Sequence, residues 1–158
     1  MGPRKEYQRD DWIPIGGNDD ATSYLPSNSA LAATFNRKRA LESGTILGRE
    51  ARGRGKDMIL APGINIHRSP LGGRNFEYMS EDPYLTAEIA VPFVEGIQQN
   101  DVSACVKHYA LNNQETDRTG YNADVSERAL WEIYLPAFRA TVKKAHTMGM
   151  MGSYNRFH

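Results

Sequence analysis

The sequence has too little cysteine and histidine to support a disulfide framework or an evident metal centre. Its 158 residues include a single cysteine, Cys105, so no internal disulfide can form. Cys105 stands in an apolar run, where a cysteine behaves as a small buried hydrophobe. The four histidines, at positions 67, 108, 146 and 158, do not have the spacing of metal ligands. We therefore predict no metal and no cofactor.

The sequence also lacks net charge and long hydrophobic runs. Nineteen basic and nineteen acidic residues cancel, so no overall field attracts nucleic acid or an anionic membrane. No apolar run approaches the roughly 20 residues that a membrane-spanning helix needs. Residues 1–12, MGPRKEYQRDDW, lack the apolar centre of a signal peptide. Nucleic acid and membrane are thus not predicted partners, and the cellular compartment stays open. The length fits one domain with a real core.

Residues 102–115, VSACVKHYALNNQE, are the most informative stretch that is present. Apolar and small residues at 102–106 lead into Lys107 and His108, and a polar cluster follows at 112–115. This order is typical of a short buried strand that opens into a loop. In a βα architecture, polar residues at the carboxyl end of such a strand hold ligands. The alternative is a strand whose Lys and His simply extend into solvent.

Hydrophobic patterning predicts strands that alternate with helices. Residues 1–29 are predicted to be an irregular loop segment, because they contain several prolines, a Gly-Gly pair and an Asn-Asp-Asp cluster. The predicted strands cover residues 30–34, 57–62, 102–106 and 148–154. The predicted helices cover residues 37–54, 83–97 and 124–145, with caps at Asn36, Asp82 and Asp124.

Two of these helices carry apolar stripes and an internal proline. The stripe of the second helix consists of Leu85, Ile89, Phe93 and Ile97, and that of the third consists of Leu130, Ile133, Tyr134, Phe138 and Val142. Pro92 and Pro136 are expected to kink or loosen them.

Alternation of this kind implies parallel strands joined by crossover helices, in a doubly wound sheet or a (β/α) barrel. A complete barrel needs eight strands and about 250 residues, so four strands and three helices would make about half of one.

Polar residues follow each predicted strand, where a ligand would be held. Asn36 follows the first, a loop at 68–77 follows the second, Lys107 and His108 follow the third, and Tyr154 with Asn155 follows the fourth. Hydrogen-bond donors beside aromatic rings suit a ligand rich in hydroxyl groups. Strict strand alternation sends adjacent side chains to opposite faces. One member of the Lys-His pair must therefore turn at the strand end to share a pocket with the other.

Five segments together carry a specific combination of motifs. They are LAATFN (31–36), ILAPGINIHRSPLGGRNFEYMSEDPYL (59–85), VKHYALNNQE (106–115), VSERALWEIYLPAFRATVKKA (125–145) and GSYNRFH (152–158). The chain resembles the N-terminal (β/α) barrel domain of glycoside hydrolase family 3, which includes β-glucosidases and β-xylosidases. The resemblance covers most of the chain from Leu31 onward. It implies an α/β fold, a partial TIM-like (β/α)8 barrel with parallel strands, in which residues 1–158 form a fragment of the catalytic domain.

The resemblance also implies substrate-binding residues. The Arg of the GRNFE segment and the Lys-His pair bind the sugar in this family, which assigns those roles to Arg74, Lys107 and His108. Tyr154 of the SYN segment would lie beside the nucleophile, and Arg4 matches an arginine that reaches the sugar near the family's early Asp-Gly-Pro motif.

Each assignment has a structural alternative. Arg74 would then only pair with Glu77 or Glu81, and His108 would be a core histidine with its hydrogen bonds satisfied. Glu77 and Glu115 are interpreted as structural partners rather than catalysts.

The family's catalytic carboxylates have no counterpart in this sequence. The nucleophilic Asp lies in a Ser-Asp-Trp-type motif after the SYN segment, and the acid/base usually comes from a following domain. The sequence therefore resembles an internal fragment with no catalytic residue of its own, which binds a β-linked oligosaccharide or glycoside and whose partner is the remainder of the polypeptide. We expect the parent protein to be a retaining β-glucosidase and the fragment to be inactive. The alternatives are a β-xylosidase, or a non-catalytic carbohydrate-binding or structural half-barrel. An N-acetylglucosaminidase fits less well, because KHYALNN replaces a KHFPGHG-type segment.

Overall fold

Three parallel strands, in the spatial order β1, β2, β4, form the sheet on which the chain is arranged. The computed structural model describes residues 22–157. The strands are β1 (Met58–Ile59), β2 (Ser103–Tyr109) and β4 (Gly149–Gly152). They fall within or overlap the strands predicted at 57–62, 102–106 and 148–154, and their parallel pairing is confirmed.

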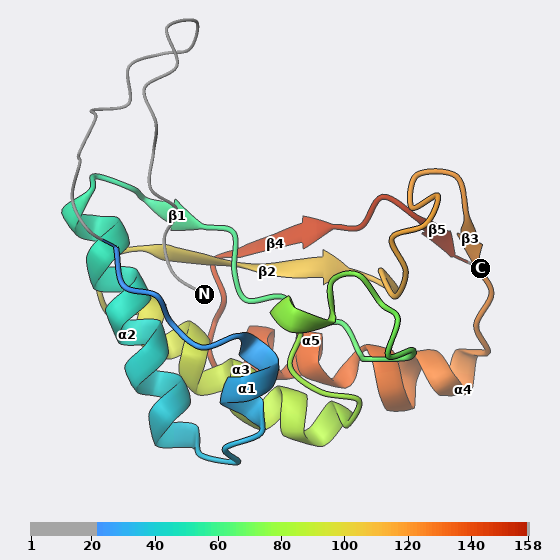
Figure 1. Ribbon diagram of the computed structural model, residues 1–158, viewed down its shortest axis with the longest axis horizontal. Helices are drawn as coiled ribbons and strands as arrows, with labels where there is room; N and C mark the ends of the chain where they lie inside the picture. Colours follow the sequence, from blue (N-terminus) through green and yellow to red (C-terminus); the bar gives the residue numbers. More distant parts are fainter. Residues whose placement is uncertain (1–21, 158) are drawn as a thin grey trace, which may run out of the picture.

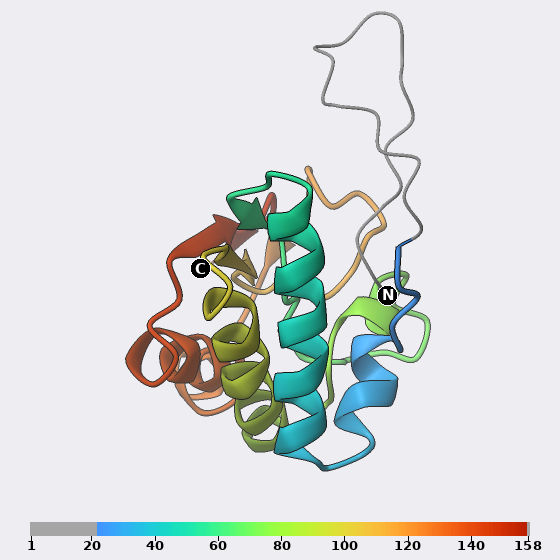
Figure 2. The same cartoon turned by 90° about the vertical axis from the view of Figure 1, so that its left-hand side faces the viewer.

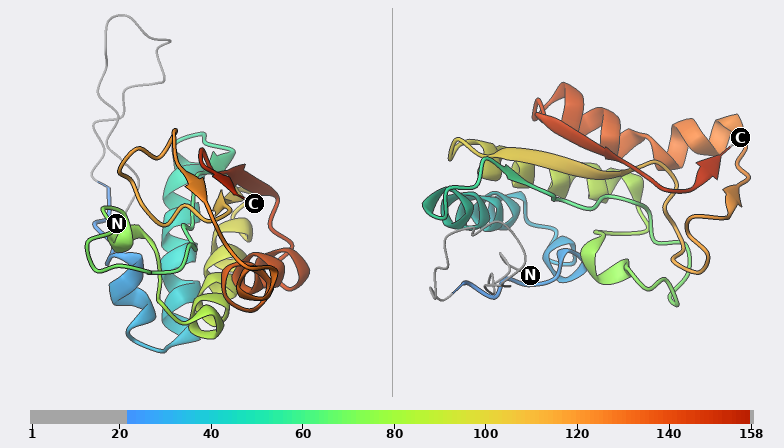
Figure 3. Two further views of the ribbon diagram at one scale, coloured as in Figure 1. Left: turned by 90° about the vertical axis from the view of Figure 1, so that its right-hand side faces the viewer. Right: turned by 90° about the horizontal axis from the view of Figure 1, so that it is seen from above.

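Helices connect these strands and cover one face of the sheet. α2 (Arg37–Gly53) precedes β1, α3 (Pro83–Gln98) connects β1 to β2, and α5 (Pro136–Lys143) precedes β4. Figures 1 and 3 show all three on the same side of the sheet. This succession of strands and one-sided helices is that of a partial (β/α) barrel, as predicted. No helix within residues 22–157 combines the length and the apolar character needed to cross a membrane.

The shorter elements occupy the connections. They are α1 (Asn28–Ala32), the 3-10 turn η1 (Asn75–Glu77), β3 (Asn122–Ala123), α4 (Glu127–Ala129), the π-helical turn η2 (Leu130–Tyr134) and β5 (Arg156–Phe157). β3 and β5 pair with each other in a separate two-stranded parallel sheet. Neither was predicted, because Asn-Ala and Arg-Phe stand in no apolar run, unlike the two-residue strand β1.

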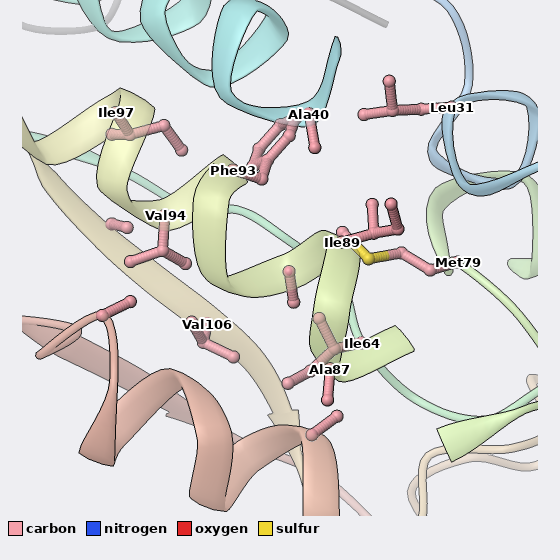
Figure 4. Packing of buried hydrophobic residues seen from close by; sticks show 14 of the residues in the cluster. Leu31, Ala40, Ile64, Met79, Ala87, Ile89, Phe93, Val94, Ile97 and Val106 are labelled. Carbon is pink, nitrogen blue, oxygen red and sulfur yellow. The ribbon is translucent and has the colours of Figure 1, made fainter. Parts of the chain in front are cut away.

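The hydrophobic core lies between the helices and β2 (Figure 4). From β2, Ala104 and Val106 point into it, which leaves Lys107 on the opposite face by strand alternation. The apolar stripe predicted on α3 is confirmed, with Leu85 partly buried and Ile89, Phe93 and Ile97 buried. α3 continues through Pro92, and the caps predicted for α2 and α3 at Asn36 and Asp82 are both present.

α2 and α3 pack side by side through glycines (Figure 2). A Cβ on Gly44 of α2 would collide with the backbone carbonyl of Phe93, and a Cβ on Gly96 of α3 would collide with the carbonyl of Leu41. The absence of side chains at these two positions lets the helix backbones approach closely. Burial of the α3 stripe depends on that approach.

The strand predicted at 30–34 is wrong, because these residues belong to the helix α1 and the turn that follows it. Ser27 caps the helix by accepting a hydrogen bond from the backbone N–H of Ala30, and Leu31 is buried in the core. Short apolar runs do not distinguish strand from helix by periodicity, and alanine favours helix. Asn36, assigned to a strand end, caps α2 instead and carries no role at the sheet edge.

The helix predicted at 124–145 is interrupted and starts later than expected. Ser126, rather than Asp124, caps α4 by accepting a hydrogen bond from the N–H of Ala129 at 3.2 Å. Pro136 has no N–H and cannot continue the α-helical ladder, so the chain widens into η2 before α5 begins at Pro136. The widened turn changes which residues face the core. Val142, predicted on the apolar stripe, is therefore 47% exposed.

Gly44→Ala is expected to lower the free energy of unfolding by about 1–3 kcal/mol, because the added methyl group overpacks the contact between α2 and α3. Chemical denaturation of the two proteins measures the difference. Gly53→Ala is the matched control, since Gly53 ends the same helix and a Cβ there meets nothing within 4 Å. That control should be neutral or stabilising by up to about 1 kcal/mol. Equal effects of the two substitutions would contradict the close-packing interpretation.

Candidate functional site

Polar side chains from three segments meet at the carboxyl end of β2. The loop that follows β1 brings η1 beside this end, and the segment that follows β2 leads into β3 nearby (Figure 1). The carboxyl ends of parallel strands are where βα architectures hold ligands. Two open hollows border the cluster. One, of about 380 Å³, is lined in part by Glu77 and Lys107, and the other, of about 550 Å³, is lined in part by Gly73 and Glu115.

Glu77 lies between two of the predicted sugar-binding residues. Its carboxylate forms an ion pair with Arg74, and Lys107 Nζ lies 3.4 Å from its Oε2 atom. The side chains of Glu77, Lys107 and Arg74 are only 10%, 15% and 21% exposed. Removal of any one of them would leave charge poorly compensated in a sheltered place.

Arg74 extends the charged network to the loop after β2. Its Nη1 atom lies 3.8 Å from Oε1 of Glu115, and Arg118 pairs with Oε2 of the same carboxylate at 3.1 Å. Burial opposes the charge of Arg74, but the hydrogen bond to Glu77 and the negative charges of Glu77 and Glu115 outweigh burial and raise its pKa. Arg74 therefore stays a cation and keeps a planar fork of donors. Glu77 and Glu115 are thus both engaged in ion pairs with cations of the cluster.

His108 is positioned by hydrogen bonds to its backbone N–H, its backbone carbonyl and its ring. Its N–H donates to Asn65 Oδ1 at 2.7 Å, and its carbonyl accepts from Asn65 Nδ2 at 2.9 Å. The ring atom Nδ1 lies 3.0 Å from the hydroxyl of Tyr78, which also accepts a hydrogen bond from Asn112 Nδ2 at 2.7 Å. Burial, and then the positive charges of Arg74 and Lys107, lower the pKa of His108 to about 4. The imidazole is therefore neutral near pH 7.

The pairing of β2 with β4 is irregular at His108. Lys107 pairs with Met151 and Tyr109 pairs with Gly152, so the register shifts across His108. Such irregularities re-aim side chains near strand ends. Lys107 and His108 both reach the 74–78 segment, the first through Glu77 and the second through Tyr78. The two adjacent residues thus share one site.

The structure brings Arg74, Lys107 and His108 together, whereas Tyr154 lies at the margin. Tyr154 is 68% exposed, and the guanidinium of Arg118 lies 5.1 Å from its ring centre. Arg118 and Glu115 thereby connect Tyr154 to Arg74. Arg4 lies outside the described residues.

Four residues of the cluster were given no role by sequence reasoning: Asn65, Tyr78, Asn112 and Arg118. Tyr78 and Asn112 stand inside the GRNFEY and NNQE segments, so their motif context was a usable signal. Arg118 stands in the loop between β2 and β3, outside the quoted motif segments, so no motif marked it. Asn65 also stands inside a quoted segment (59–85), but its partner His108 is 43 positions away, so no local pattern predicts their contact. Within residues 22–157, no three His, Cys, Asp or Glu side chains are grouped so as to hold a metal ion.

The family model of the N-terminal domain of glycosyl hydrolase family 3 matches residues 16–158. The chain therefore belongs to glycosyl hydrolase family 3, and the resemblance inferred from its motifs is confirmed.

Its relatives include several β-glucosidases. The chain is 50% identical to β-glucosidase BoGH3A from Bacteroides ovatus over 155 residues, which is 98% of this chain and 21% of that protein. It is 44% identical to an exo-α-(1→6)-L-arabinopyranosidase from Bifidobacterium longum, over 97% of this chain and 19% of that protein. The structure of β-glucosidase 3B from Thermotoga neapolitana in complex with glucose superposes with a TM-score of 0.91 at 46% identity, over 99% of this chain and 21% of that one. The chain thus spans about a fifth of these relatives.

Stability is expected to fall as the pH is lowered from about 6.5 to 4. A histidine in the unfolded chain has a pKa near 6.5, whereas the pKa of folded His108 is about 4. Over this window the unfolded state binds the extra proton, so protonation favours unfolding. The contribution is at most about 3 kcal/mol. The charged or titratable groups that face His108 are Arg74, Lys107, Glu77, Arg118 and Tyr78.

His108→Asn should flatten this pH dependence, measured as the free energy of unfolding at a series of pH values. His146→Asn is the matched control, because His146 is exposed and its backbone φ of 50° suits asparagine. The control should keep the slope of the parent protein. A slope unchanged by His108→Asn would show that other groups cause the pH dependence.

Proposed function

We propose that this chain is the sugar-binding part of the catalytic barrel of a retaining β-glycosidase, which removes terminal non-reducing β-D-glucosyl residues. The observation that carries the proposal is the cluster of Arg74, Lys107 and His108 at the carboxyl end of β2. A solved relative with 46% identity and the same fold is a β-glucosidase in complex with glucose. In the proposed enzyme, residues 1–158 belong to the N-terminal barrel domain, and residues 1–29 lead into it.

The chemistry of the cluster suits a pyranose ring. Arg74 offers a planar pair of donors, Lys107 offers a compact ammonium, and the neutral His108 offers a ring N–H or an acceptor nitrogen. These groups would hold sugar hydroxyls while the anomeric carbon gains positive charge. Contacts that tighten as the ring flattens toward the oxocarbenium-like transition state would increase kcat as well as binding.

The catalytic carboxylates are proposed to lie elsewhere in the enzyme. A retaining mechanism needs two carboxyl groups about 5 Å apart, a nucleophile and an acid/base. Within the cluster, Glu77 is engaged by Arg74 and Lys107, and Glu115 is engaged by Arg74 and Arg118. Carboxylates held by such pairs are poor candidates for attack on a sugar. We therefore assign no catalytic residue to this chain and propose that the remainder of the polypeptide completes the site.

The uncovered face and the open edge of the sheet support a covering partner. Met58 of β1, which pairs with Ser103 on the face without helices, is 47% exposed, and Met150 of the edge strand β4 is 38% exposed. Helices cover the other face only (Figure 1). Further strands and loops of the same polypeptide would cover these side chains in a closed barrel.

Sugar specificity separates the candidate functions. The arabinopyranosidase relative, at 44% identity, favours a pentopyranosidase as the second candidate. A β-xylosidase is the other pentopyranosidase to test. The complete enzyme should be assayed on aryl β-D-glucoside, β-D-xyloside and α-L-arabinopyranoside. The β-D-glucoside should have the highest kcat/KM. A preference for a pentoside would replace the proposed specificity, and no turnover of any member would favour a non-catalytic sugar-binding module.

Lys107→Ala and His108→Ala should each lower kcat/KM of the complete enzyme about ten- to a hundredfold. Each removes a hydrogen bond worth roughly 1.5–3 kcal/mol in a sheltered site. Because the contacts strengthen in the transition state, kcat should fall as well as KM rise. Arg74→Lys should also be damaging, because lysine cannot supply a two-donor fork.

Two exposed residues provide matched controls for these variants. Lys144→Ala and Arg128→Lys alter side chains that are 62% and 84% exposed and pair only with helix-surface carboxylates. Both should retain the activity of the parent enzyme. If the site variants retain it too, or if they act only by unfolding the protein, the sugar site lies elsewhere.

The 158-residue chain alone should not hydrolyse an aryl β-glucoside, because loss of the nucleophile removes the covalent step. Purified chain would be assayed for released aglycone against a buffer blank. Turnover that disappears in Glu77→Gln or Glu115→Gln would instead place the catalytic carboxylate in this cluster.

A further inference from the structure

A chain of hydrogen bonds connects Glu115 to the ring of His108. Asn112 Nδ2 lies 3.2 Å from Glu115 Oε1 and 2.7 Å from the hydroxyl of Tyr78. The hydroxyl of Tyr78 lies 3.0 Å from Nδ1 of His108. Tyr78, His108 and Asn112 are 3%, 5% and 3% exposed. Sheltered groups of this kind cannot exchange their partners freely with water.

Glu115 determines which groups donate and which accept in this chain of hydrogen bonds. Its carboxylate is paired with Arg74 and Arg118, and an ionised carboxylate only accepts hydrogen bonds. The atom of Asn112 that faces it must therefore be the amide NH2 group, which fixes the orientation of the side chain. Asn112 Oδ1 has no partner within residues 22–157, so no other contact described there favours the flipped amide.

The same direction continues to the histidine. The second N–H of Asn112 points at Tyr78, so the oxygen of Tyr78 accepts. The single proton of the Tyr78 hydroxyl then needs an acceptor, and the acceptor within reach is Nδ1 of His108. A ring nitrogen that accepts carries no proton. In a neutral imidazole the proton must then be on Nε2.

We propose that Glu115, Asn112 and Tyr78 act as positioning residues that hold His108 in the tautomer protonated at Nε2, so that His108 meets the sugar as a hydrogen-bond donor. We call the hydrogen-bonded chain Glu115–Asn112–Tyr78–His108 the relay. The donor and acceptor roles within the relay follow from the geometry, whereas its use toward a sugar rests on the proposed function. The site would then present donors only, from Arg74, Lys107 and His108. Each sugar hydroxyl bound there would accept, and its own proton would be free to point at a carboxylate supplied by the rest of the enzyme.

The neutral state that the relay requires agrees with the surroundings of the ring. Burial and the cations Arg74, Lys107 and Arg118 disfavour a second proton, whereas Glu77 favours it, and the resulting pKa is about 4. Near pH 7 the ring therefore carries one proton, and the relay decides which nitrogen holds it. Without the relay, either nitrogen could hold it.

Nitrogen-15 NMR of the complete enzyme with labelled histidine tests this directly, since protonated and unprotonated ring nitrogens have distinct shifts. The signal of His108 is identified by its loss in His108→Gln. We expect Nδ1 of His108 to be unprotonated and Nε2 to be protonated. A wild-type ring protonated at Nδ1 would overturn the proposal without any variant.

Tyr78→Phe should release the ring into a mixture of the two tautomers and weaken inhibition by glucose about five- to tenfold. Tyr134→Phe is the matched control, because Tyr134 is also buried and its hydroxyl contacts Arg68 rather than a histidine. It should change neither readout. A ring that stays protonated only at Nε2 in folded Tyr78→Phe would show that Tyr78 does not set the tautomer and would overturn the proposal.

Glu115→Gln provides a second, independent variant if Tyr78→Phe does not fold. A glutamine can offer its own NH2 group to Asn112, so the direction of the relay is no longer imposed, and the Nδ1-protonated form should appear. Its absence in the folded variant would overturn the role of Glu115. A wild-type ring protonated at Nε2 in an enzyme that does not bind glucose would support the relay and count against the proposed function.

Discussion

The carboxylate of Glu77 is the contact on which the arrangement of the site depends. This carboxylate pairs with Arg74, immediately before η1, and with Lys107 on β2. The backbone carbonyl of Glu77 also accepts a hydrogen bond from Asn28 of α1 at 2.7 Å. Three segments far apart in sequence are thus connected through one residue. Because Glu77 is buried among cations, its charge costs little there and would cost much without them. The loop after β1 therefore has one preferred position against the sheet.

The cluster offers a sugar hydrogen-bond donors but few free acceptors. Arg74 and Lys107 are cations, and both carboxylates of the cluster are engaged in ion pairs. A sugar hydroxyl, however, has a proton to donate as well as lone pairs to offer. A set of donors alone can align hydroxyl oxygens but cannot accept their protons. The chemistry of the ligand therefore requires acceptors from other segments, in agreement with the small share of the family 3 relatives that this chain covers.

Local signals were predicted well from the sequence, and long-range or competing ones were not. Asn36 and Asp82 cap their helices because a cap depends on the next few residues only. Asp124 and Ser126 were both possible caps for the same helix, and the structure uses Ser126. The π-helical turn before Pro136 was not predicted either, because no hydrophobic periodicity reveals it. Lys107 and His108 were predicted to share a site from their strand end and motif, and both contact the 74–78 segment. The bond between Tyr78 and His108 spans 30 positions, and no local pattern encodes it.

The pairing of β3 with β5 has a consequence for how the protein is made. Asn122 and Ala123 end the loop that holds Asn112, Glu115 and Arg118, and their strand partners, Arg156 and Phe157, come later in the chain. At roughly 5–20 residues per second, that loop is synthesised seconds before its strand partner. α2, β1, α3 and β2 all precede the loop in the chain. Contacts among these elements can therefore form first, and the polar end that carries the site is completed afterwards.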